Sequence, residues 1–284
     1  MMESRGRVFV LLTGILWSLA GVFIKALDLP PLSIVFYRSF FAALFFLFFL
    51  RKRGWTFGIP LFVSVASYTA AISFFVWANK LTTAANAIVL QYTAPIFVFI
   101  FARLLFREPI LRLNLFTLLL GMAGVGIIFF GSAGEQEAAG VAVALVSGFL
   151  FSIYMTNLRF LGGVQPVNLT FVNNLVCWMT LLPLVKSDLS ATPAQLLALA
   201  VMGVVQLGIP YFLFSKGLET IALQEASLII LVEPVLNPIW VALVVGEIPS
   251  AATLSGGAVI LLSLGFRYVW ALFGRIYPGN QDPR

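Results

Sequence analysis

The chain has 284 residues, of which 61% are hydrophobic and only 10% are charged, and its formal net charge is +6. Charged residues make up about a quarter of a typical soluble domain, so this composition excludes a soluble globular protein and predicts a polytopic membrane protein. The positive charge does not indicate a nucleic-acid partner, because the basic residues lie in short gaps between apolar runs, where they act as topology determinants.

Ten apolar runs are long enough to cross about 30 Å of hydrocarbon. They lie near residues 8–26, 32–50, 59–79, 84–104, 113–131, 138–158, 167–185, 194–214, 221–245 and 251–273. No small-residue cleavage site stands out after MMESRGR, so we expect the first run to be a retained helix and not a signal peptide. Most connections are short. We therefore expect one all-α transmembrane domain, 1–284, with antiparallel neighbouring helices.

The basic residues also predict the orientation of the chain. With the N-terminus in the cytoplasm, 13 of the 17 lysines and arginines fall on the inner side and only Lys25, Lys80 and Lys186 on the outer side, while Arg38 lies within a span. This asymmetry follows the positive-inside rule. Both termini should then be cytoplasmic, and we expect a multi-pass protein of the inner membrane.

The two halves of the chain repeat one pattern at a spacing that drifts by only a few residues. The matched residues, at spacings of 135, 136, 136, 139 and 139, are Pro31 with Pro166, Thr117 with Thr253, Gly121 with Gly257, Pro95 with Pro234 and Glu108 with Glu247. Each half, 1–133 and 134–284, holds five spans, and because five is odd the second half enters the membrane from the opposite side. Such inverted repeats are typical of secondary transporters, whose substrates bind between the halves near the midplane.

At this point the sequence resembles a known family. The segments that carry the resemblance are LLTGILWSLAGVFIK at residues 11–25, LTTAANAIVLQYTAPIFVFIFARLLFRE at 81–108 and LETIALQEASLIILVEPVLNPIWVALVVGE at 218–247. They are similar to the EamA family of the drug/metabolite transporter superfamily, and the resemblance covers nearly the whole chain. It implies two inverted five-helix repeats around a central cavity, with the fourth and ninth helices beside it. Within the family, the length and first helix are most similar to the YddG-type amino-acid exporters.

Residues 14–25 and 148–159, GILWSLAGVFIK and GFLFSIYMTNLR, form the clearest pair in the repeat. Gly14, Ser18 and Gly21 share one helix face, and Gly148 and Ser152 share the equivalent face. Small residues on a helix face permit either close helix packing or an open cavity wall. We expect Ser18, Gly21 and Ser152 to border a cavity, with packing as the alternative.

Aromatic and basic residues accompany the two small-residue faces. Trp17 and Phe151 lie one step away and could form an aromatic wall. Lys25 and Arg159 end the two faces, and inverted symmetry would place them at the outer and inner mouths of a pathway. The alternative for these two is a snorkelling anchor at the membrane interface. In the third span, Tyr68 and Trp77 are further candidate substrate contacts.

Prolines predict breaks in the fourth and ninth spans, since Pro95 and Pro234 cannot donate a backbone hydrogen bond. Carbonyls freed at membrane depth are tolerated where they face protein or water, and such breaks mark binding sites. The polar residues beside the predicted breaks are Gln91, Tyr92, Glu233 and Asn237. Gln206 and Tyr211 in the eighth span complete the cavity candidates.

Among the charged residues within the predicted spans, Glu233 and Arg38 need an explanation. Glu233 would cost at least about 2.5 to 3.5 kcal/mol as a buried carboxylate, so it should be protonated, paired or facing water. It could couple transport to protons, bind a substrate amine or cap the broken helix. Arg38 could hold a substrate carboxylate or tie two helices through backbone carbonyls, and its place near the outer interface favours the tie.

Glycine clusters occur in the fifth and tenth spans, in GMAGVG at 121–126 and at Gly256 and Gly257. Such clusters favour close helix contact. We expect them to join the two halves or to form a homodimer through residues 113–131 and 251–273. For Glu108 and Glu247 we expect a capping or ion-pair role.

The sequence therefore predicts a secondary transporter that exports small metabolites, above all neutral or aromatic amino acids, by alternating access. Efflux of lipophilic cations or other drugs is the alternative, with Glu233 as the counter-charge. An enzyme is not favoured, because the chain has no histidine and one cysteine, Cys177. A receptor would have little need of inverted halves. We expect no cofactor, metal or catalytic residue, and no GxxxxGK[ST] segment is present for direct use of ATP.

Overall fold

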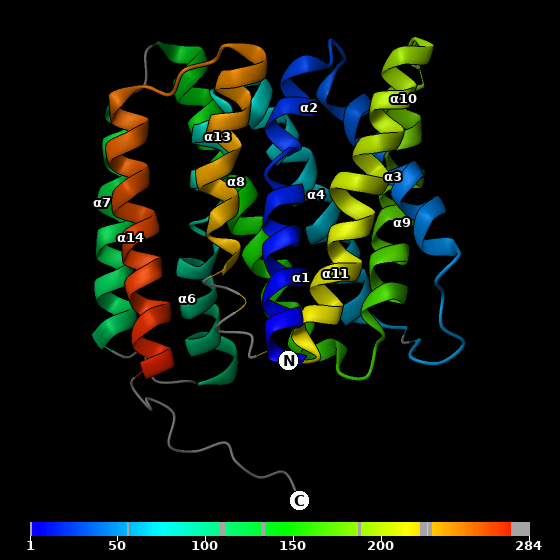
Figure 1. Cartoon of the computed structure of the whole chain (residues 1–284), viewed down its shortest axis with the longest axis horizontal. Coiled ribbons are helices and arrows are strands. Elements are labelled where there is room, and N and C mark those ends of the chain that lie inside the picture. The colour runs from blue at the N-terminus through cyan, green and yellow to red at the C-terminus, as the bar shows by residue number, and fades with distance from the viewer. Residues whose placement is uncertain are drawn as a thin grey trace, which may run out of the picture.

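The computed structural model describes residues 2–55, 57–107, 112–131, 134–186, 189–221, 226 and 229–273, which form a bundle of roughly parallel and antiparallel helices (Figure 1). Six helical segments of this part are long and apolar enough to cross a membrane: 4–26, 59–81, 84–106, 136–161, 166–185 and 193–218. Four shorter apolar helices lie at 31–47, 115–130, 232–245 and 251–267. The all-α membrane fold with ten spans is confirmed.

The first half contains α1 (Met2–Trp17), α2 (Ala20–Ala26), α3 (Pro31–Leu47), α4 (Ile59–Leu81), α5 (Ala84–Gln91), α6 (Ala94–Phe106) and α7 (Arg112–Phe130). The second half contains α8 (Glu135–Asn157), the 3₁₀ turn η1 (Leu158–Leu161), α9 (Pro166–Val185), α10 (Pro193–Val201), the π-helix η2 (Met202–Gly208), α11 (Ile209–Leu218), α13 (Val232–Val245) and α14 (Ala251–Phe273). The matched residues Pro31 and Pro166 each begin a helix, the position that proline favours.

Helix contacts between the halves follow the inverted repeat. The α1 helix packs on α11 as α8 packs on α4, while α3 packs on its counterpart α9 and α7 on its counterpart α14. The same exchange relates α13, which contacts α1 and α2, to α5 and α6, which contact α8. The start of α1 and the end of α14 lie at the same end of the bundle (Figure 1). Helices of each half therefore pack mainly against helices of the other half.

The two predicted breaks are present. The α5 helix ends at Gln91 and α6 begins at Ala94, next to Pro95. In the second half, α13 begins at Val232 after a turn at Leu231, next to Pro234. These breaks lie at equivalent positions of the repeat, as the missing proline N–H groups predict.

Two irregularities were not predicted. The first span is broken between α1 and α2. There the N–H of Leu19 donates to the carbonyl of Leu16, whereas in a regular α-helix it would donate to that of Ile15. The eighth span widens into the π-helix just before Pro210, and the N–H of Ile209 donates five residues back, to Val204. Short π segments of this kind are frequent at functional sites.

The glycine clusters join the halves. A Cβ on Gly124 would lie 2.6 Å from the carbonyl oxygen of Gly256, and a Cβ on Gly256 would lie 2.6 Å from that of Gly124. Only glycine allows two backbones to approach this closely. The prediction that these clusters link the two halves is confirmed for this α7 and α14 contact.

Candidate functional site

The break in the first span is held by two side-chain amides of the second half. Asn237 Nδ2 donates to the carbonyl of Ser18 at 3.0 Å, and Gln206 Nε2 donates to that of Trp17 at 3.4 Å. Asn237 is fully buried and Gln206 nearly so. Since carbonyls freed at membrane depth need donors, these amides make the break possible.

The small-residue face of the first span packs tightly against α13. Ser18 is buried, and its hydroxyl donates to the carbonyl of Ile15 at 2.6 Å and accepts from Trp240 Nε1 at 3.0 Å. A Cβ on Gly21 would lie only 2.6 Å from Asn237 Oδ1. The packing alternative therefore describes Gly21 in this conformation, and the expected open wall is absent at that position.

Aromatic rings line both sides of the helix breaks. The rings of Trp17 and Tyr211 meet edge to face with centroids 5.1 Å apart. Tyr68 of the first half and Tyr154 of the second half lie 5.5 Å apart, and Tyr154 stacks on Phe151 at 5.8 Å. Rings in such contacts form a firm apolar surface that could receive an aromatic or aliphatic group.

Glu233, at the start of α13, is paired across the halves with Tyr92. The Tyr92 hydroxyl donates to Glu233 Oε2 at 2.7 Å, so each partner comes from one of the two proline breaks. Of the three expected alternatives for Glu233, paired, protonated or facing water, this hydrogen bond corresponds to the first. Two amide oxygens, Gln206 Oε1 and Asn237 Oδ1, are buried without a hydrogen-bond partner among the described residues.

The interpretation of Arg38 as a tie to backbone carbonyls near the outer interface is wrong. Arg38 lies seven residues into α3, roughly 10 Å along the helix axis, and is only 3% exposed. Its Nε has no hydrogen-bond partner in the part of the chain that the structure describes. Because Arg38 is close in sequence to a loop, its position along the chain did not reveal that its side chain is buried.

Electrostatic proximity links these residues into one group. The Tyr211 hydroxyl interacts electrostatically with both Arg38 and Glu233. The Tyr68 hydroxyl interacts in the same way with Arg38 and Tyr211. We call the following residues the central cluster: Trp17, Arg38, Tyr68, Tyr92, Tyr154, Gln206, Tyr211 and Glu233. Tyr211 and Glu233 are both partly exposed.

Other predicted residues lie outside the central cluster. Gln91 donates to the hydroxyl of Ser147 at 3.0 Å and so joins α5 to α8. Ser152 is buried, with its hydroxyl on the carbonyl of Phe149. Trp77 is 45% exposed and borders a hollow of about 260 Å³ beside Pro30 and the end of α9. The structure does not bring Trp77 to the cluster.

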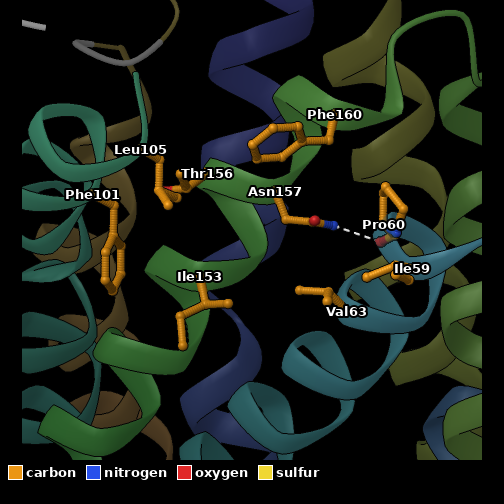
Figure 2. Close-up of a pocket in the computed structure, with 9 residues that line it drawn as sticks. All are labelled: Ile59, Pro60, Val63, Phe101, Leu105, Ile153, Thr156, Asn157 and Phe160. Carbon is orange, nitrogen blue, oxygen red and sulfur yellow. Dashed lines mark hydrogen bonds between the residues drawn. The ribbon is translucent and has the colours of Figure 1, made fainter. Parts of the chain in front are cut away.

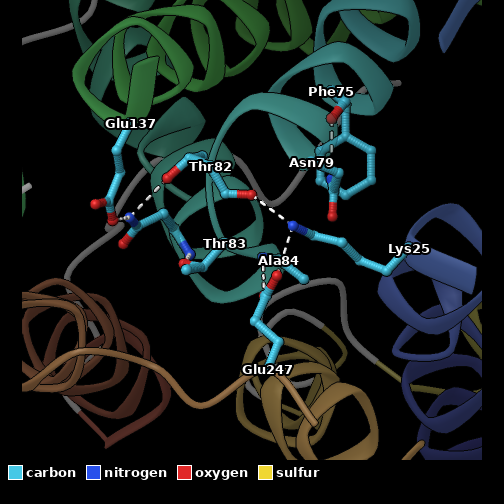
Figure 3. A network of polar contacts seen from close by, with 9 residues as sticks. Lys25, Phe75, Asn79, Thr82, Thr83, Ala84, Glu137 and Glu247 are labelled. Carbon is cyan, nitrogen blue, oxygen red and sulfur yellow. Dashed lines mark hydrogen bonds and ion pairs between the residues drawn. The ribbon is translucent and has the colours of Figure 1, made fainter. Parts of the chain in front are cut away.

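At the end of the bundle where α2 ends and α5 begins, Lys25 takes part in a polar network that joins the halves (Figure 3). Its ammonium forms an ion pair with Glu247 and donates to the carbonyl of Thr82 at 2.8 Å. Glu247 also accepts from the backbone N–H of Ala84 at 2.6 Å, which confirms its expected capping and ion-pair role. Lys25 is therefore paired and is not a free anchor.

Just beyond the C-terminal end of α8, the Arg159 guanidinium lies over the ring of Phe106, 4.7 Å from its centroid. A hollow of about 400 Å³ opens nearby between α4, α6 and α8 (Figure 2). Its lining is almost wholly apolar, and Asn157 there donates to the carbonyl of Pro60 at 2.7 Å. Glu108, for which a cap or ion pair was expected, lies outside the described residues.

Two residues of this region were missed at the level of sequence, Tyr154 and Trp240. Each follows a predicted residue by three positions, Phe151 and Asn237 respectively, and so shares its helix face. Helical spacing applied to the candidates themselves would have found both.

Comparisons with known proteins agree with this architecture. The model of the EamA-like transporter family matches residues 4–130 and 138–268, one match in each half. An uncharacterized transporter of Archaeoglobus fulgidus is 30% identical over 264 residues, covering 90% of this chain and 93% of that protein. The uncharacterized transporter YdfC of Bacillus subtilis is 29% identical over 198 residues, covering 67% and 64%. One crystal structure superposes with a TM-score of 0.69 over 96% of this chain and 100% of the other, at 16% identity, which shows the fold alone. The chain therefore belongs to the EamA-like transporter family, and it is a multi-pass membrane transporter and not an enzyme.

Proposed function

We propose that the protein is a secondary transporter that exports small metabolites, above all neutral and aromatic amino acids, across the inner membrane, in the manner of the YddG-type exporters. The observation that carries the proposal is the central cluster. Within the part of the chain that the structure describes, it combines aromatic rings, an amide oxygen without a hydrogen-bond partner and the carboxylate of Glu233 at the junction of the two halves. Substrate sites of inverted-repeat transporters lie at such junctions, beside broken helices.

The chemistry of the cluster suits a neutral amino acid. The rings of Trp17 and Tyr211 offer an apolar surface for its side chain. Glu233, already held by Tyr92, offers a negative partner for its ammonium group. The free oxygen of Gln206 offers a further acceptor. Of the remaining candidates, Ser18, Gly21 and Asn237 support the site through packing, while Phe151 acts through its stacking on Tyr154 and Ser152 lies next to it on α8.

Alternating access follows from the arrangement of the halves, 1–133 and 134–284. The Lys25 and Glu247 ion pair closes the outer end between them, so release to the outside requires that pair to separate. Lys25 then acts at the outer mouth as part of a gate, and Arg159 is its counterpart at the inner mouth. Self-association into a homodimer would use the outer faces of α7 and α14, since their glycines already contact each other.

Efflux of lipophilic cations is the second candidate function, and Glu233 is the observation that favours it. Its carboxylate lies deep in a spanning segment among aromatic rings, a setting that also suits a bulky cation. The two functions differ in what they require of the substrate: a cation needs Glu233 alone, whereas an amino acid also needs a partner for its carboxylate.

Reconstituted protein tests the proposal. Liposomes containing the purified protein should move labelled phenylalanine, leucine or similar amino acids faster than empty liposomes, and Glu233→Gln should reduce this flux severalfold. Glu219→Gln is the matched control, because the Glu219 side chain is 60% exposed and pairs with Lys216, three residues away in the same segment. Movement of lipophilic cations without any amino acid would support the second function and contradict the first.

A further inference from the structure

Arg38 is the buried group that the functions above leave unexplained. It is 3% exposed, its Nε is without a hydrogen-bond partner, and no carboxylate of the described residues forms an ion pair with it. Burying a cation is costly unless it is paired, and an ionisable residue within a membrane span is a functional candidate for that reason. The missing partner points to a ligand.

The surroundings of Arg38 place it at the centre of the molecule. Its carbonyl oxygen would lie 2.7 Å from a Cβ on Gly203, so α3 rests directly on the π-helix. Gln206 lies three residues further along that π-helix and has a free amide oxygen. The Arg38 side chain is within electrostatic range of the Tyr68 and Tyr211 hydroxyls, and Tyr211 is in turn within range of Glu233.

We propose that Arg38 binds the carboxylate of the transported molecule, and that the substrates are monocarboxylates with an apolar or aromatic body, amino acids included. This rests on the proposed path between the two halves. A guanidinium is planar and matches a carboxylate through two parallel hydrogen bonds. Arg38 and Glu233 then form the positive and negative poles of one site, with Tyr211 between them.

The charge of the site favours a carboxylate over a phosphate. Within the described part of the central cluster Arg38 is the single cation, whereas Lys25 is bonded at the outer end. A phosphate monoester carries nearly two negative charges, and one guanidinium would leave much of that charge unpaired. Glu233 would also repel a dianion. A zwitterion fits both groups, and a monocarboxylate matches the single charge of Arg38 with less repulsion from Glu233 than a dianion.

Isosteric pairs of small molecules test Arg38 directly. Phenylalanine is compared with phenylalaninamide, and 3-phenylpropionate with 3-phenylpropionamide, by ligand-dependent thermal stability of the purified protein and by liposome flux. The variants are Arg38→Gln and Arg38→Lys. Arg267→Gln is the matched control, because Arg267 is also an arginine of an apolar helix, α14, but its guanidinium lies over the ring of Phe99 on α6.

The unmodified protein should prefer the acid to the amide by about tenfold or more in apparent affinity, the expected effect of a hydrogen bond between charged groups. Arg38→Gln should abolish the preference, Arg38→Lys should retain part of it, and Arg267→Gln should leave it unchanged. If Arg38→Gln does not fold, a loss of preference in Arg38→Lys relative to Arg267→Gln gives the same support.

Three results would overturn the assignment: an acid preference that survives in Arg38→Gln, an unmodified protein that no carboxylate stabilises, or phenyl phosphate bound in preference to the carboxylates. The two proposals can fail separately. If 3-phenylpropionate binds through Arg38 while no amino acid moves, amino-acid export fails and the carboxylate site stands. If Arg38→Gln moves phenylalanine as the unmodified protein does, export stands and the role of Arg38 fails.

Discussion

The first spans of the two halves share one local sequence pattern, a glycine followed four residues later by a serine, but only the first of them is broken at the serine. Ser18 and Ser152 are both buried, and both donate to a backbone carbonyl three residues earlier, at 2.6 Å and 2.5 Å. Yet α1 ends at Trp17, beside Ser18, whereas α8 continues unbroken to Asn157. The serine and the small residues therefore do not decide whether the helix breaks.

The difference comes from the partner helices. Asn237 and Gln206 bond the carbonyls of Ser18 and Trp17, but their counterparts in the first half, at spacings of 139 and 135, are Val98 and Ala71. Neither apolar side chain can satisfy a freed carbonyl. A symmetric scaffold thus carries an asymmetric site, in which the second half supplies the amides and the first half supplies the broken helix.

The largest effect is expected at Gly21. Gly21→Leu should lower the free energy of unfolding by about 3 kcal/mol, because the added side chain would overlap Asn237 and Val241. The counterpart of Gly21 at a spacing of 134 is Met155, which is 40% exposed, and Met155→Leu should change stability by less than about 0.5 kcal/mol. Thermal or chemical unfolding in detergent compares the two. Equal stability of both variants would contradict the tight contact.

Asn237→Leu should cost about 2 kcal/mol, since it removes the donor to the Ser18 carbonyl and leaves that group buried without a partner. Val98→Leu, at the matching position of the first half, should cost less than about 1.5 kcal/mol because no polar partner is lost. Unfolding measurements on both variants, with circular dichroism, test the ranking. A harmless Asn237→Leu would show that the break does not depend on the amide.

Tyr92→Phe should cost about 1 kcal/mol through loss of the hydrogen bond to Glu233, and it should lower amino-acid flux. Tyr37→Phe is the control, because the Tyr37 hydroxyl donates to the Leu189 carbonyl in an exposed region. Flux in liposomes separates the two. Flux lowered equally in both variants would argue against a special role for the proline breaks.

The smallest effect is expected from the outer ion pair. A double-mutant cycle on Lys25→Met and Glu247→Gln should give a coupling energy of about 0.5 to 1 kcal/mol, since both side chains are partly exposed, at 16% and 21%. The more exposed Lys216 and Glu219 pair should give about 0.3 kcal/mol. The reverse order would mean that the outer network does not hold the halves together.

The sequence predicted the parts of this fold that follow from single residues. Apolar run length predicted the spans, and Pro95 and Pro234 predicted two breaks, because a missing N–H acts locally. The break at Ser18 depends on amides from distant helices, and the burial of Arg38 depends on how α3 rests on the π-helix. Such contacts between distant segments leave no local pattern. For the same reason the tight packing of Gly21 could not be separated from an open cavity wall.

The central claim is that substrate crosses between the halves and that the outer end must open for it to leave. It can be tested by joining Ala26→Cys on α2 to Ile248→Cys beside Glu247 with a reducible bifunctional thiol reagent, in protein in which Cys177 is replaced by alanine. Both positions are exposed. Cross-linked protein in liposomes should lose amino-acid flux and regain it after reduction. Flux that continues unchanged through the cross-linked protein would contradict the account.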